Sequence, residues 1–119
     1  MTAARIPTTL DEAVDQLVSS LSQIDRAYIE ATPLRAFRGS IHMSAGMGLR
    51  NEWRLWDKTG PLNEELAALG FHHGDDRSGL ILAMLWSCVH EVAFDIAAEA
   101  EANRAHWARA GVKPDGTPL

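Results

Sequence analysis

The stretch from Leu80 to Val89 constrains the fold most strongly, because it is apolar on almost every side at helical spacing. A helix of this kind must be covered by other elements, so the stretch predicts a central buried helix. The longer apolar run around Leu80 to Phe94 is broken by Ser87, His90 and Glu91, and it is too short and too polar to span a bilayer. No segment shows the alternation of polar and apolar residues that is typical of a strand. The sequence therefore predicts an all-α protein, a compact bundle of about five helices with a long C-terminal helix.

Capping residues and helix breakers give the expected boundaries. Thr9 with Glu12 fits a capping box, in which both side chains accept hydrogen bonds from the first backbone N–H groups. Asp75 or Asp76 is expected to cap the last helix, because a carboxylate suits the free N–H groups and the positive end of the helix dipole. The expected helices cover residues 10–21, a short segment after Ser22, residues 33–56, residues 62–69, and a last stretch that continues to residue 110.

The length of 119 residues is sufficient for one domain with a hydrophobic core. We expect a flexible N-terminal arm over residues 1–8, a single helical domain over residues 9–111, and a disordered tail over residues 112–119. The tail carries two prolines and a glycine, which do not favour regular structure.

Charge and cysteine content exclude several classes of protein. The chain has 11 basic and 16 acidic residues and a net charge of −5, which argues against nucleic-acid binding because phosphates require a basic surface. The single Cys88 excludes an internal disulfide and a multi-cysteine zinc site. The N-terminal residues lack the apolar core of a signal peptide. We therefore expect a cytoplasmic protein with no membrane partner and no cofactor.

Three glycines, Gly39, Gly46 and Gly48, fall inside the helix expected over residues 33–56. A glycine in a helix interior costs about 1 kcal/mol relative to alanine. Its presence there indicates the close approach of another backbone or of a ligand, and close helix packing is the favoured interpretation.

The polar residues before the last helix allow two interpretations. His72, His73, Asp75 and Asp76 carry imidazole nitrogens and carboxylate oxygens, which can bind a divalent metal. However, adjacent histidines point in different directions, and no pair has the i, i+4 spacing of a helical zinc site. The favoured interpretation is a capped helix start.

Arg50 and two tryptophans are further candidates. Arg50 can form a bidentate bridge to the acidic pair, or it can receive an anionic ligand beside a helix N-terminus. Trp53 lies on an apolar helix face and is either core or a stacking platform for a ligand. Trp107 lies on an Ala-rich C-terminal helix that either folds back on the bundle or makes a dimer contact, in which Trp107 would be an interface anchor.

The run G-M-G-L-R-N-E-W-R-L-W, followed by H-G-D-D-R-S-G-L-I-L, resembles a family of small bacterial proteins known only as a domain of unknown function. The resemblance covers residues 7–86 approximately and leaves residues 87–111 as a C-terminal extension. The family pattern has proline at the position of Gly74. The glycine is expected to loosen the start of the helix. The two blocks of the pattern fall on His42, Gly46, Arg50, Asn51, Trp53, Leu55 and Trp56, and on His73, Asp75, Asp76 and Ser78.

The resemblance implies a shared polar site but no chemistry. Its expected members are His42, Arg50, Asn51, His73, Asp75 and Asp76. The first functional hypothesis is a non-enzymatic binding or regulatory module, similar to an immunity protein or antitoxin, that acts on a protein partner or as a homodimer. The alternative is a binder or enzyme for a small anionic or nucleotide-like ligand, with the polar site around it. The third is a metal-dependent hydrolase.

Overall fold

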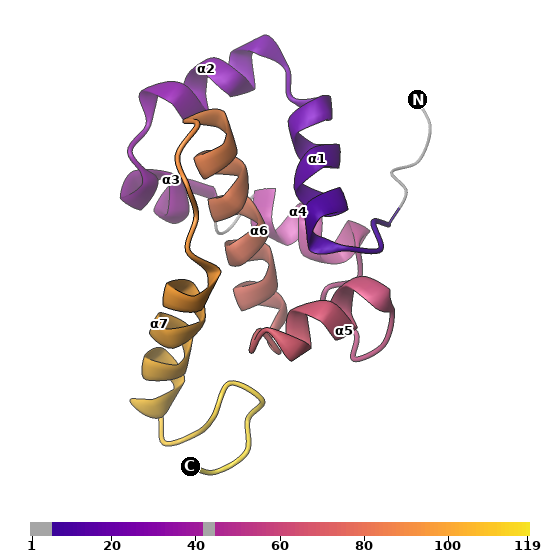
Figure 1. The fold of residues 1–119 in the computed structure, drawn as a ribbon, viewed down its shortest axis with the longest axis vertical. Helices are drawn as coiled ribbons and strands as arrows, with labels where there is room; N and C mark the ends of the chain where they lie inside the picture. Colours follow the sequence, from indigo (N-terminus) through magenta and orange to yellow (C-terminus); the bar gives the residue numbers. More distant parts are fainter. Residues whose placement is uncertain (1–5, 42–44) are drawn as a thin grey trace.

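The computed structural model describes residues 6–41 and 45–119 (Figure 1). This part of the chain forms helices and no strand, so the predicted all-α class is confirmed. The predicted number of about five helices was too low. The helices of the described residues are α1 (Leu10–Ser20), α2 (Gln23–Ala31), α3 (Leu34–Ile41), α4 (Ala45–Glu52), α5 (Pro61–Ala68), α6 (Gly74–Val89) and α7 (Ile96–Ala108).

Helix α6 is the central element of the fold, as its apolar sequence predicted. It packs against α1, α2, α3 and α4, and Figure 1 shows it in the middle of the molecule. Leu80, Ile81 and Leu85 are buried among these helices, and Phe71 joins them from the connection that precedes α6. Removing apolar surface from water is the main favourable contribution to folding, and many of the buried apolar side chains belong to this helix.

Each of the two expected long helices corresponds to two helices in the structure. The helix predicted over residues 33–56 corresponds to α3 and α4, which lie on either side of residues 42–44, outside the described residues, and α4 ends at Glu52. The last predicted helix is present as α6 and α7, because Glu91 adopts a left-handed conformation (φ 54°) and the backbone N–H of Val92 bonds back to Ser87. Asp95 then starts α7 by accepting a hydrogen bond from the N–H of Ala98.

The predicted helix starts near the N-terminus agree with the structure in part. The Thr9 side chain accepts from the N–H of Glu12, and Ser22 caps α2. The Glu12 carboxylate accepts from Thr8 rather than from Thr9, so only half of the expected capping box forms. A carboxylate oxygen of Glu65 in α5 accepts from the N–H of Leu10 and ties α5 to the start of α1.

Helix α7 lies beside the lower part of the bundle (Figure 1), with Ala100 in the core and polar contacts to α3 and to Gly70. Both Nη atoms of Arg38 in α3 donate to the Glu99 carboxylate, and Asn103 donates to the carbonyl of Gly70. After α7, the segment expected to be a disordered tail has a turn, in which the Lys113 N–H bonds to the Thr117 carbonyl at 2.8 Å. No helix of the described residues is long and apolar enough to cross a membrane.

Candidate functional site

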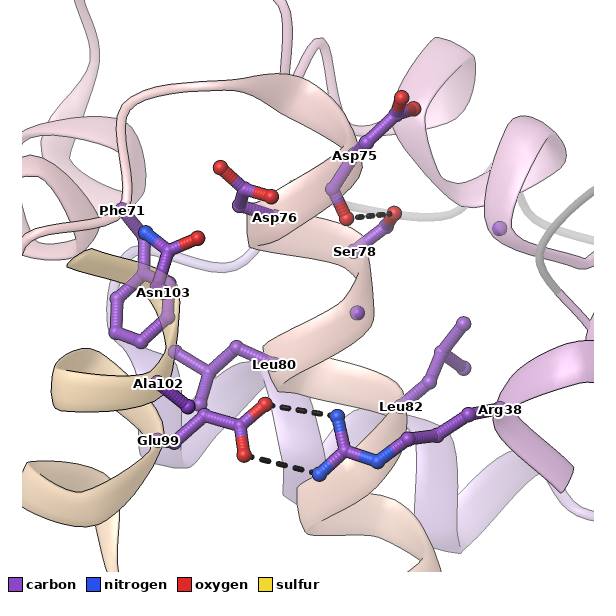
Figure 2. A pocket seen from close by; sticks show the side chains of 12 residues that line it. Arg38, Phe71, Asp75, Asp76, Ser78, Leu80, Leu82, Glu99, Ala102 and Asn103 are labelled. Atoms are coloured by element: carbon purple, nitrogen blue, oxygen red, sulfur yellow. Dashed lines mark hydrogen bonds and ion pairs between the residues drawn. The ribbon is translucent and has the colours of Figure 1, made fainter. Parts of the chain in front are cut away.

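A polar cluster forms where α4, the start of α6 and α7 meet. It contains four of the residues that were predicted to form the site. It also contains three side chains that were not predicted to belong to it. Its members are Arg50, Trp56, His73, Asp75, Asp76, Ser78 and Trp107. Figure 2 shows Asp75, Asp76 and Ser78 along the first turns of α6.

Arg50 is the most deeply buried charge of the cluster, with 4% of its surface exposed. Its Nε lies 3.2 Å from a carboxylate oxygen of Asp75, and its Nη1 donates to the hydroxyl of Ser78 at 2.9 Å. The guanidinium carbon lies 5.4 Å from the centroid of the Trp56 ring, which is a cation–π distance. Arg50 thus contacts the first turn of α6 through Asp75 and Ser78, while the expected bidentate bridge to the acidic pair is not among the contacts of the described residues.

His73, rather than Asp75 or Asp76, is the N-cap of α6, so the predicted capping residue was wrong. His73 has the extended backbone of a capping residue, and its Nδ1 accepts from the N–H of Asp75 at 3.1 Å. Asp75 and Asp76 lie within the first turn, where their charges still favour the helix dipole.

Trp107 folds back onto the cluster. Its indole N–H donates to a carboxylate oxygen of Asp76 at 2.8 Å, and its ring lies 5.8 Å from that of His73. The side chain is partly buried by these contacts. Of the two arrangements that the sequence left open, the structure shows the one in which the C-terminal helix covers its own bundle.

Gly74 has a structural role that differs from the expected one. A Cβ atom at this position would lie 2.5–2.9 Å from three atoms of the Trp56 ring. Proline carries a Cβ as well, so neither proline nor alanine fits beside this ring. Gly74 thus permits the contact between Trp56 and the start of α6, instead of merely loosening the helix.

The remaining predicted residues do not join the cluster in the described part of the chain. His42 lies outside the described residues. Asn51 is exposed, and His72 is exposed without entering the cluster's contacts. Trp53 is only 3% exposed and belongs to the core, which leaves no open ring face for a stacked ligand.

The residues considered as metal ligands from the sequence were His72, His73, Asp75 and Asp76. Within residues 6–41 and 45–119, no three His, Cys, Asp or Glu side chains are placed to hold one ion. His73 already uses Nδ1 as a cap, and Arg50 lies against Asp75.

Arg77 is an important residue that sequence reasoning missed. It is 3% exposed and donates to three backbone carbonyls, those of Phe71 (2.8 Å), Leu55 (3.0 Å) and Asp57 (2.8 Å). Burial lowers the pKa of its guanidinium below the ordinary value, but an arginine remains charged at neutral pH. The available signal in the sequence was a charged residue only three positions before the apolar stretch that begins at Leu80.

Two of the hollows in the described part of the surface lie on either side of Leu82 and bear on function. The first, of about 320 Å³, lies between α6 and α7 beside the polar cluster (Figure 2). Leu80 and Leu82 are among its apolar lining residues, and the Arg38–Glu99 pair lies at the end of the hollow away from Asp75.

The second hollow, the apolar groove, measures about 470 Å³ and is lined by residues of α1, α2, α3, α4 and α6, together with Leu21. Its buried apolar residues are Ile29, Phe37, Leu49, Leu82 and Leu85. Tyr28 is half exposed, and Asp25 and Glu52 contribute exposed carboxylates.

The fold and the cluster define a small all-α protein in which a histidine-capped central helix is clamped to its neighbours by arginine and tryptophan side chains. Residues 6–88 match the family described as domain of unknown function (DUF6794), and the chain belongs to that family. The match ends in the last turn of α6, so α7 and Trp107 lie beyond it. Comparison with curated proteins and with solved structures finds no match.

Proposed function

We propose that this protein is a non-enzymatic binding module that acts through contact with a protein partner. The observation that carries the proposal is the apolar groove, a hollow in the surface whose walls are apolar side chains of five helices.

The contacts of the polar cluster support a structural role for it. Arg50 contacts Asp75, Ser78 and the Trp56 ring, and Asp76 accepts a hydrogen bond from Trp107. A catalytic group needs access to a substrate and a correctly placed partner for proton transfer. Arg50, which is 4% exposed and held by these contacts, lacks that access.

Binding of a small molecule is the second candidate, and the hollow shown in Figure 2 is the observation that favours it. Its charged lining residues are Asp75, Asp76, Glu99 and Arg38, of which Arg38 is neutralised by Glu99. The surplus of carboxylates repels an anionic or nucleotide-like ligand and favours a cationic one.

Photo-crosslinking in the cell, with a benzoylphenylalanine in place of Tyr28, tests the proposal. The same probe in place of Lys58, which is exposed in the loop before α5, is the matched control. We expect a discrete protein adduct from position 28 and none from position 58. Native mass spectrometry of the purified chain completes the test. No protein adduct from either position in folded protein would contradict the proposal, and a bound small molecule in the mass spectrum would then favour the second candidate.

A further inference from the structure

We infer that the apolar groove docks a partner segment that carries a bulky apolar side chain flanked by lysine or arginine. This inference rests on the proposed function and assigns the surface and the chemistry of the partner.

Apolar side chains form the groove. Phe37, Leu49 and Leu82 are 3%, 8% and 6% exposed, respectively, and they line it together with the half-exposed Tyr28. An apolar anchor placed against them removes further apolar surface from water on both partners. Interfaces commonly depend on one or two such anchors in a pocket.

Gly48 leaves open space in the wall of the groove. It lies inside α4 and lines the groove, and a Cβ atom built on it meets no other atom within 4 Å. Glycine destabilises a helix interior relative to alanine, and none of the described residues lies close enough to require the absence of a Cβ, which is also true of Gly39 outside the groove. Close packing against the described residues, the favoured interpretation of this glycine from the sequence, therefore does not explain it. The space over Gly48 is open to a partner side chain that enters the groove.

The charge around the groove selects the partner. Asp25 and Glu52 are exposed, and none of the described residues that line the groove is a lysine or an arginine. Residues 10–31, which include α1 and α2, carry five acidic residues and one arginine, a net charge of −4 out of the −5 of the whole chain. Complementary charge favours a basic segment and speeds its association. A second copy of this acidic chain would meet repulsion here, so the occupant is a different, basic protein.

The test uses two synthetic amphipathic helices of roughly 18 residues labelled with fluorescein. Both have leucine on one face, and the remaining positions are lysine in one peptide and glutamate in the other. Fluorescence anisotropy measures their affinity for the whole chain. We expect the lysine peptide to bind about tenfold more tightly or better than the glutamate peptide, with an affinity that falls as salt is added.

The decisive variant is Gly48→Leu, which places a side chain in the open space of the groove. Its matched control is Gly39→Leu on α3, where a Cβ also meets nothing within 4 Å but which does not line the groove. We expect Gly48→Leu to weaken binding of the lysine peptide at least about tenfold, and Gly39→Leu to leave it unchanged. Equal effects of the two variants would overturn the inference.

A charge reversal keeps the test valid even if the leucine variant fails to fold. Asp25→Lys with Glu52→Lys alters only exposed side chains, and it should reverse the preference in favour of the glutamate peptide. An unchanged preference would contradict the inference.

Crosslinking separates this inference from the function on which it rests. A protein adduct that maps to a basic, apolar-anchored segment of the partner at position 28 supports both. An adduct that forms from position 58 instead overturns the groove assignment but leaves a protein-binding role intact. If neither position forms an adduct in folded protein, both proposals fail.

Discussion

Substitution of Gly74 by alanine is predicted to destabilise the protein through the Trp56 ring. The added Cβ would lie within 2.5–2.9 Å of three ring atoms, so the ring must move. Trp56 is 50% exposed and can swing outward, but it would then lose its contacts with Arg50 and His73. Such contacts are worth about 0.5–2 kcal/mol each. Alanine offsets up to about 1 kcal/mol through its higher helix propensity. We expect a net loss of about 1–2 kcal/mol in the free energy of unfolding.

A double-mutant cycle with Trp56→Ala, measured by urea denaturation, isolates this cause. Without the indole ring, Gly74→Ala should be neutral or should stabilise the protein by up to about 1 kcal/mol. The coupling energy between the two positions should therefore be about 2 kcal/mol. Gly74→Ala that costs the same with and without the Trp56 ring would refute this reasoning.

Three further predictions concern contacts on other parts of the structure. Arg77→Met should lower the free energy of unfolding by about 3–5 kcal/mol, since three carbonyls lose a charged donor, and a loss below about 1 kcal/mol in chemical denaturation would contradict this role. Trp107→Phe should cost about 1 kcal/mol and should speed amide hydrogen exchange in α7 but not in α1, because the bond to Asp76 is lost; equal exchange in both helices would refute it. The pKa of Asp115 lies below its ordinary value because its carboxylate accepts from the Thr117 hydroxyl and from the Thr117 N–H. The C-terminal turn should therefore be intact above the ordinary range of an aspartate pKa and should loosen as the pH falls through the lowered value, and an amide chemical shift of Thr117 that stays constant on acidification would contradict it.

The helical class was predictable because apolar spacing and capping residues act locally. The apolar stretch of α6 and the Thr9 cap needed no tertiary information. The division of the last helix was not foreseen, since the residues around Glu91 are compatible with a continuous helix, although Asp95 was a usable start signal. Helix boundaries depend on such weak local competition.

The grouping of the site was partly predictable, but its bonds were not. The sequence indicated that Arg50 and Asp75 meet, and the structure places them in contact. The sequence could not assign the N-cap of α6 to His73 rather than to a neighbouring aspartate, because the assignment depends on which residue adopts the extended backbone conformation. The contact of Trp107 with Asp76 joins residues 31 positions apart, so no local pattern reveals it. The groove over Gly48 likewise depends on five helices together.

The central claim is that the polar cluster holds the fold together while the apolar groove binds the partner. The most direct test measures the yield of the protein adduct from the probe at position 28, normalised to folded protein, in two variants. Trp107→Phe alters the cluster, and Gly48→Leu fills the groove. The account predicts that Trp107→Phe retains the adduct and that Gly48→Leu loses it. Retention by Gly48→Leu and loss by folded Trp107→Phe would contradict the account and would place the function in the cluster.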